Sequence, residues 1–151
     1  MFSSILNWYS FTSLNQKKQD SNFYYLSLLK NDDNVFGYSI HGLWPNFADG
    51  TYPSFCKKEE FDIHKLKPIM KDLLDFWELP KDHNKEEDSF WKHEWLKHGS
   101  CMFVEMDEFT YFKKVLDLYL DIMNKKVNIE DYKKGRSYMI PLNLNFEIIR
   151  V

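Results

Sequence analysis

The strongest constraint on the fold is the segment 107–124, DEFTYFKKVLDLYLDIMN. Its apolar side chains recur at intervals of three or four: Phe109, Phe112, Leu116, Tyr119 and Met123. This spacing places them on one face of an α-helix, and such a stripe is stable only when another part of the chain covers it. With 44% hydrophobic and 28% charged residues, the composition can supply that cover. We therefore expect a globular protein with this helix against its core.

Two short aromatic and β-branched segments, residues 23–29 and 36–44, predict β-strands. The turn-rich sequence KNDDN separates them, so they can form a hairpin. Residues 45–56, with two prolines and an Asp-Gly pair, predict a long loop. The final segment 144–151, LNFEIIRV, is typical of a last strand.

Residues 67–78 carry apolar positions at helical spacing, with Pro68 tolerated in the first turn. Together with the strands, this predicts an α+β fold: an antiparallel sheet packed against several helices in a single domain. A chain of 151 residues fits one domain with a sizeable core. We expect that domain at residues 23–151, with residues 1–22 as an N-terminal extension.

The net charge of −3 excludes a general phosphate-neutralising surface, so any nucleic acid must be bound at a local site. No apolar run approaches the roughly 20 residues that span a membrane, so no membrane association is expected. The N-terminal sequence also lacks the basic region, apolar stretch and small-residue cleavage site of a secretory signal.

The segment FWKHEWLKHGSC, residues 90–101, admits three interpretations: a zinc site, an acid–base site or a solvated helix rich in charge. Zinc-binding helices of the HExxH type place two histidines four residues apart, about 40° around the helix axis. His93 and His98 are five apart, or about 140° around the axis, so they cannot easily share one ion. We therefore expect no metal site.

As a helix, this segment begins after Ser89 as the N-cap and ends at Gly99. One contiguous arc of the helix carries His93, Glu94, Lys97 and His98. The remaining side, suited to a core, carries Trp91, Trp95, Leu96 and Gly99. A solvated face would also account for the charges, so the helix alone leaves the choice between acid–base chemistry and solvation open.

A second cluster, YSIHGLWPN, places His41 at the end of a strand, before a sharp turn expected from Gly42, Trp44 and Pro45. A lone strand histidine is usually structural. However, His41, His93 and His98 each lie in an aromatic setting next to a turn or a helix end. The other two histidines, His64 and His83, lie among charges and are expected to be merely solvated.

The segments YSIHGLWP and FWKHEWLKHGSC, with GTYPSFC between them, resemble the active-site segments of the T2 ribonuclease family. These secreted or endolysosomal endoribonucleases need no metal ion or other cofactor. The resemblance extends over residues 23–123. It implies a metal-independent endoribonuclease that cleaves single-stranded RNA to 2′,3′-cyclic phosphate ends and acts as a monomer.

By motif position, the resemblance implies that His98 is the general base for the ribose 2′-hydroxyl and that His41 is the general acid for the departing 5′-oxygen. His93 would hold the phosphate, while Glu94 and Lys97 stabilise the transition state. Imidazole suits both proton transfers because its ordinary pKa of about 6.5 allows one ring to be neutral while another is charged. DNA lacks the 2′-hydroxyl nucleophile, so we expect no DNA cleavage.

The resemblance also implies a first base pocket made by Trp44, Asn46 and Tyr52, with Phe90 near the second base. Aromatic stacking tolerates any base. The other interpretation is that Trp44 and Phe90 belong to the core. Asn46 stands where an acidic residue is typical of the family; an amide both donates and accepts hydrogen bonds, so it affects base preference.

Cys56 and Cys101 match a disulfide of the family, which would tie the loop to the catalytic helix and indicates an oxidising compartment, secreted or endolysosomal. On spacing alone, free thiols and a disulfide remain equally open.

Two features depart from the family: LLKNDDN replaces a glutamine-tryptophan segment and a cysteine, and we expect the domain to be shortened at its C-terminal end. They favour the alternative of a weakly active or inactive RNA-binding or interaction module.

Overall fold

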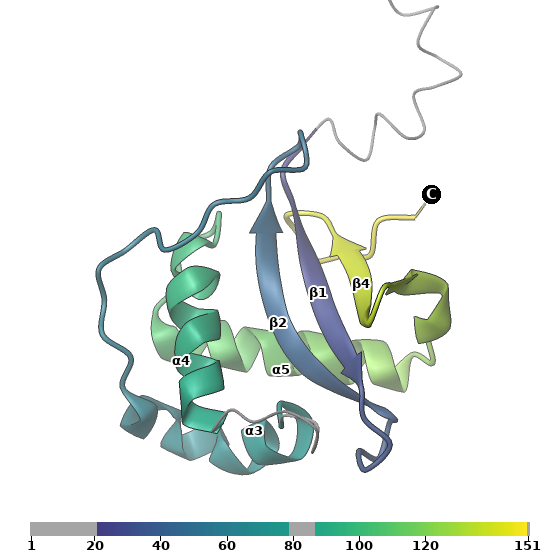
Figure 1. Cartoon of the computed structure of the whole chain (residues 1–151), viewed down its shortest axis with the longest axis horizontal. Coiled ribbons are helices and arrows are strands. Elements are labelled where there is room, and N and C mark those ends of the chain that lie inside the picture. Colours follow the sequence, from purple (N-terminus) through teal and green to yellow (C-terminus); the bar gives the residue numbers. More distant parts are fainter. Residues whose placement is uncertain (1–20, 79–86, 151) are drawn as a thin grey trace, which may run out of the picture.

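The computed structural model describes residues 21–78 and 87–150. Its elements, in chain order, are β1 (Phe23–Lys30), β2 (Tyr38–Asn46), the 3₁₀ helix η1 (Ile63–Ile69), α3 (Met70–Phe76), α4 (Glu87–Lys97), η2 (Gly99–Cys101), α5 (Glu108–Asn124), η3 (Ile129–Tyr132), β3 (Lys133–Lys134) and β4 (Ser137–Leu142). The strands form one four-stranded sheet in the order β2-β1-β4-β3, and all pairs are antiparallel. In Figure 1, α5 crosses behind the strands and α4 lies beside β2. The predicted α+β fold with an antiparallel sheet is confirmed.

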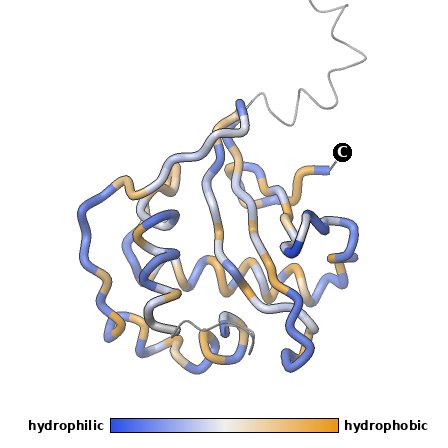
Figure 2. The backbone as a smooth tube through the Cα atoms, viewed as in Figure 1, coloured by the Kyte–Doolittle hydropathy of each residue, from blue (hydrophilic) through white to orange (hydrophobic). Residues whose placement is uncertain are grey.

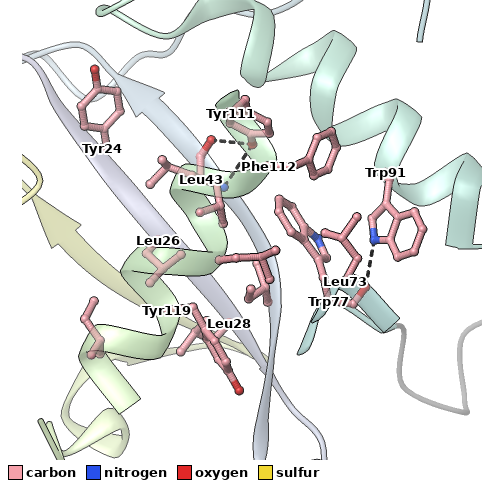
Figure 3. Packing of buried hydrophobic residues seen from close by; sticks show 14 of the residues in the cluster. Tyr24, Leu26, Leu28, Leu43, Leu73, Trp77, Trp91, Tyr111, Phe112 and Tyr119 are labelled. Atoms are coloured by element: carbon pink, nitrogen blue, oxygen red, sulfur yellow. Dashed lines mark hydrogen bonds between the residues drawn. The ribbon is translucent and has the colours of Figure 1, made fainter. Parts of the chain in front are cut away.

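The core lies between the sheet and α5 (Figure 3). From β1, Tyr24, Leu26 and Leu28 point to this side and are completely buried. The helix α5 begins after Asp107, whose side chain accepts a hydrogen bond from Thr110 N at 2.8 Å. Hydrophobic and hydrophilic residues alternate along α5 in Figure 2, as expected for a helix that buries one face. The predicted helix is therefore confirmed.

The edge strand β2 spans Tyr38–Asn46 and runs through Gly42, Trp44 and Pro45, so the sharp turn expected after His41 was wrong. Pro45 is tolerated because β2 has a partner strand on one side only. On the other side, the hydroxyl of Tyr111 donates to Leu43 O at 3.0 Å and accepts from Leu43 N at 3.3 Å (Figure 3). Trp77 Nε1 donates to His41 O at 3.1 Å. Side chains from α5 and from the end of α3 thus hold the backbone of β2.

Two helix boundaries differ from the prediction. The segment expected as one helix over 67–78 begins earlier, as η1, and becomes α-helical only over Met70–Phe76, so Pro68 lies inside η1. The helix α4 already includes Glu87 and Asp88, so Ser89 is not its N-cap. Its predicted end is confirmed, because the α-helix stops at Lys97 and η2 begins at Gly99.

The prediction of a last strand over 144–151 was also wrong. Asn143 Oδ1 accepts from Asn145 N and Glu147 N, which closes a turn, and Phe146 has a positive φ of 64°. The third long strand is instead β4, which pairs with β1. Only an isolated bridge joins Leu142 to Ile148. The described residues 144–150 therefore form a turn with a single bridge to β4 and not a strand.

The predicted N-terminal extension, residues 1–22, lies almost entirely outside the described residues, as does His83. Over the part of the chain that the structure describes, no helix is long and apolar enough to cross a membrane.

Candidate active site

A cavity of about 420 Å³ opens between β2, the C-terminal half of α4 and the loop after β2. Every residue predicted for catalysis or base binding lines it: His41, Trp44, Asn46, Tyr52, Phe90, His93, Glu94, Lys97 and His98. We call this cavity the site pocket. The structure thus brings together two sequence segments that are about fifty positions apart, as the Trp44–Glu94 hydrogen bond illustrates.

Of the four residues in the predicted arc, three lie on α4, and His98 follows the end of the helix. His93, Glu94 and Lys97 face the site pocket. Trp91 and Trp95 lie on the other side, 2% and 0% exposed, and Trp91 Nε1 donates to the carbonyl of Trp77 at 2.9 Å (Figure 3). Burial of these two indoles fixes the rotation of α4, so the charged arc must point to β2.

A β-bulge places His41 in the site pocket. The pairing of β1 with β2 shifts between Ser27 and Leu28, which are opposite Gly42 and Ile40, so His41 is the extra residue. Bulges of this kind re-aim a side chain and are frequent beside active sites. The His41 ring lies 4.9 Å from the Trp44 ring and 5.5 Å from the Phe90 ring, measured between centroids.

The carboxylate of Glu94 is the most buried charge of the site, with 1% of the residue exposed. Trp44 Nε1 donates to Glu94 Oε1 at 2.7 Å, and His41 Nε2 lies 3.9 Å from Glu94 Oε2. The carboxylate approaches the backbone of β2 so closely that a Cβ atom at Gly42 would overlap Oε1 and lie 2.5 Å from Trp44 Nε1. Glycine at position 42 is therefore required by this packing.

His98 is 5% exposed, and its ring stacks on the Trp44 ring with centroids 4.9 Å apart and planes 24° apart. Burial, followed by the positive charges of Lys97, His93 and His41, lowers the pKa of His98 from 6.5 to about 3. The ring is therefore neutral even in mildly acidic solution, so it can accept a proton there.

The rim of the site pocket combines aromatic and polar groups. Tyr52 is 53% exposed, and Lys97 Nζ lies 5.8 Å from the centre of its ring. Asn46 is nearly buried; with its amide oriented so that Nδ2 donates, it bonds to the carbonyls of Trp44 and Pro45, each at 3.2 Å. Oδ1 of Asn46 is then the amide atom left to accept a hydrogen bond from a ligand.

Trp44 and Phe90 are less exposed than Tyr52, so a base can stack on them less easily. Trp44 is half-buried and already holds Glu94 and His98. Phe90 is 4% exposed and belongs to the hydrophobic core as well as to the pocket wall. Both interpretations of Phe90, core and pocket, therefore apply.

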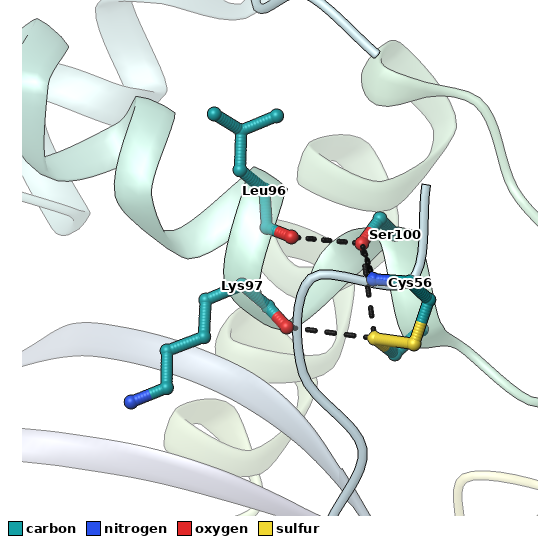
Figure 4. The surroundings of a disulfide bond; sticks show 5 residues. Cys56, Leu96, Lys97 and Ser100 are labelled. Atoms are coloured by element: carbon teal, nitrogen blue, oxygen red, sulfur yellow. Dashed lines mark hydrogen bonds between the residues drawn. A yellow bond between two sulfur atoms is a disulfide. The ribbon is translucent and has the colours of Figure 1, made fainter. Parts of the chain in front are cut away.

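A disulfide joins Cys56 to Cys101, with Cα atoms 5.2 Å apart (Figure 4). Ser100 reinforces the junction: its hydroxyl donates to Leu96 O at 2.8 Å and accepts from Cys56 N at 3.1 Å. Phe55 N donates to Lys97 O at 3.0 Å. The loop after β2 is thus fixed to the end of α4.

The histidines predicted to lie outside the site are consistent with that expectation where they are described. The side chain of His64 is 89% exposed, and its Nδ1 atom lies 3.1 Å from Asp62 Oδ1. His83 lies outside the described residues. Within residues 21–78 and 87–150, no group of three or more His, Cys, Asp or Glu side chains has the geometry to hold a metal ion.

The model of the Ribonuclease T2 family matches residues 2–132, which is most of the chain. The chain belongs to the ribonuclease T2 family. The matched range includes both histidine-bearing segments and both cysteines of the disulfide.

Two curated T2 relatives illustrate the similarity. The extracellular ribonuclease LE of Solanum lycopersicum is 35% identical over 105 residues, which are 67% of this chain and 46% of that protein. The ribonuclease T2 protein rnst-2 of Caenorhabditis elegans is 42% identical over 89 residues, or 54% of this chain and 31% of that protein. The chain thus spans about a third to a half of the length of the curated relatives it matches.

Among solved T2 structures, RNase NT in complex with 5′-AMP superimposes with a TM-score of 0.60. The superposition covers 86% of this chain and 90% of RNase NT, at 19% sequence identity. At this identity, the superposition shows that the fold is shared.

The sequence interpretation missed four residues that line the site pocket: Tyr25, Gly50, Lys134 and Met139. Tyr25 could have been found, because residues of β1 alternate between the two faces and Tyr24 is a core residue. Lys134 and Met139 lie on β3 and β4, strands that the sequence pattern did not identify.

Proposed function

We propose that the chain is an endoribonuclease that cleaves single-stranded RNA by transphosphorylation, without a metal ion. The observation that carries this proposal is the convergence of His41 and His98 on one pocket, each 4.9 Å from the Trp44 ring. Two imidazoles beside one phosphodiester can move both protons that the reaction requires.

In the first step, neutral His98 takes the proton of the ribose 2′-hydroxyl while the 2′-oxygen forms a bond to phosphorus. The bond from phosphorus to the 5′-oxygen breaks, and protonated His41 donates its proton to that oxygen. The products are a 2′,3′-cyclic phosphate and a free 5′-hydroxyl. The lowered pKa keeps the His98 ring unprotonated in acid, as a general base requires, although it also makes the ring a weaker proton acceptor.

The charged groups on α4 would stabilise the transition state. Lys97 and His93 line the pocket and can hold the growing negative charge on the phosphate oxygens. The Glu94 carboxylate lies 3.9 Å from His41 Nε2, so it can pair with the imidazolium before the proton is transferred. Trp44 holds this carboxylate in place by its indole hydrogen bond.

Base recognition would depend mainly on Tyr52, whose ring is half-exposed at the rim. Stacking on such a ring contributes on the order of 1–3 kcal/mol per base and tolerates any sequence. Asn46 Oδ1 would accept from a base amino group, whereas Trp44 and Phe90 shape the pocket wall.

The direct test is incubation with single-stranded RNA at pH 5 and pH 7.5, with and without EDTA, followed by analysis of the RNA ends. We expect cyclic-phosphate ends that persist in EDTA, and no cleavage of an oligonucleotide with a 2′-deoxy residue at the target bond. Loss of cleavage on chelation would refute metal independence. Tight RNA binding with no cleavage would instead support an RNA-binding module.

A further inference from the structure

The site pocket continues along the sheet into a second hollow of about 530 Å³, which we call the side groove. The two cavities share Tyr25, Lys134 and Met139. The side groove then extends past Lys133 to Arg150. A ligand strand that fills the site pocket would therefore have a continuous path onto the neighbouring strands of the sheet.

Tyr25 occupies the centre of this path. In the sheet register, it lies opposite Trp44 of β2 on one side and Pro141 of β4 on the other. The Tyr25 ring is half-buried, on the face away from α5, and Lys134 Nζ lies 5.8 Å from its centre. The Lys134 ammonium lies over the ring, and because the lysine side chain is flexible, a base that stacks on the ring can displace it towards the adjoining phosphate.

The charge of the side groove also fits a polyanion. Lys133, Lys134 and Arg150 are exposed, and within the described part of the chain none of them is in an ion pair. The acidic residue of the groove is Asp131, whose carboxylate accepts a hydrogen bond from Asn128 Nδ2 at 3.0 Å. The lining of the groove therefore carries more positive than negative charge, in a protein whose net charge is −3.

We propose that the side groove is a further RNA subsite, which binds a nucleotide beyond the two that flank the scissile phosphate. Its base stacks on Tyr25, and its phosphate contacts Lys134, with Lys133 and Arg150 beside it. The proposal rests on the proposed ribonuclease function, because it extends the same strand of substrate out of the site pocket.

Binding of uncleavable RNA tests the subsite without relying on catalysis. We would measure affinities for 2′-fluoro oligonucleotides of two and five nucleotides by fluorescence anisotropy. The longer one should bind at least about tenfold more tightly, and Tyr25→Ala should remove about tenfold of that advantage. Tyr25→Phe, which keeps the ring, should retain it.

The salt dependence of binding tests the cation. Lys134→Ala should lower the slope of log affinity against log salt by about 0.7 for the five-nucleotide ligand, as expected for one lost phosphate contact with a single strand. The matched control is Lys71→Ala, which removes the same charge from an exposed position on α3 and should leave the slope unchanged. Circular dichroism would verify that all variants are folded.

The outcomes separate the two proposals. Equal affinity for both lengths, or equal weakening of both by Tyr25→Ala and Lys134→Ala, would overturn the subsite even if the protein cleaves RNA. The expected length dependence without cleavage of ordinary RNA would leave the subsite standing and overturn the ribonuclease function.

Discussion

The contact between Glu94 and the backbone of β2 makes Gly42→Ala the most informative perturbation. The new Cβ would overlap Glu94 Oε1 and lie 2.5 Å from Trp44 Nε1, so the carboxylate must move and the Trp44–Glu94 hydrogen bond must break or lengthen. A hydrogen bond to a charged group is worth about 1.5–3 kcal/mol, and overpacking costs about 1–3 kcal/mol. We expect a loss of about 3 kcal/mol in the free energy of unfolding.

For a domain of this size, that loss corresponds to a decrease in Tm of roughly 6–12 °C. Displacement of Glu94 should also reduce kcat/KM for RNA about a hundredfold, because the carboxylate lies beside His41. Urea denaturation and an RNA cleavage assay measure the two effects. The control is Gly37→Ala, at a φ of +81° with no atom within 4 Å of the added Cβ, which should cost about 1 kcal/mol in backbone strain and leave the rate unchanged.

A double-mutant cycle distinguishes this contact from general disruption. In a Glu94→Ala background the overlapping oxygen is gone, so Gly42→Ala should cost clearly less stability than in the wild-type protein. If Gly42→Ala is no more destabilising than Gly37→Ala and cleaves RNA within twofold of the wild-type rate, the described packing of Glu94 against β2 is incorrect.

Three further predictions concern the histidines and the disulfide. His98→Ala and His41→Ala should each lower kcat at least about a hundredfold, whereas His64→Ala should have no effect; near-normal rates in either of the first two would refute their roles. Because the folded-state pKa of His98 is depressed to about 3, its contribution to stability is fully present above pH 6.5 and is lost as the pH falls towards 3, by on the order of 1 kcal/mol per pH unit. Urea midpoints that fall equally with pH in the wild-type and His98→Ala proteins would contradict this. Removing the Cys56–Cys101 disulfide by two Cys→Ala substitutions should lower the unfolding free energy by about 4 kcal/mol, and a loss below 1 kcal/mol would exclude a substantial loop-closure effect.

The parts of the site that depend on helical period were predictable from the sequence. The arc of His93, Glu94, Lys97 and His98 follows from position alone, because two tryptophans occupy the opposite side of α4 and can only be buried. The helical period could not predict that this arc lies close to His41, because His41 belongs to a different element, β2. It was inferred from the resemblance of both segments to one family, and the structure shows the shared pocket.

Features set by tertiary contacts were missed or misplaced. Gly42 and Pro45, which follow His41, are local turn signals, but β2 continues through Pro45 because it is an edge strand held by Tyr111. At the C-terminal end, the alternating pattern of LNFEIIRV indicated a strand, yet hydrogen bonds to Asn143 close a turn there. In both places, a contact with a distant or neighbouring side chain overrides the local preference.

The hydrogen bonds from Trp77 and Tyr111 to β2 also determine whether this edge strand can pair with another chain. Unpaired edge strands can recruit another chain through their free amides and carbonyls, which leads to aggregation or swapped dimers. On β2, the carbonyl of His41 is taken by Trp77, both polar groups of Leu43 are taken by Tyr111, and Pro45 has no amide hydrogen to offer. The strand that carries a proposed catalytic histidine is therefore closed to strand addition, so the mouth of the site pocket can remain open to a long nucleic acid without the sheet growing beside it.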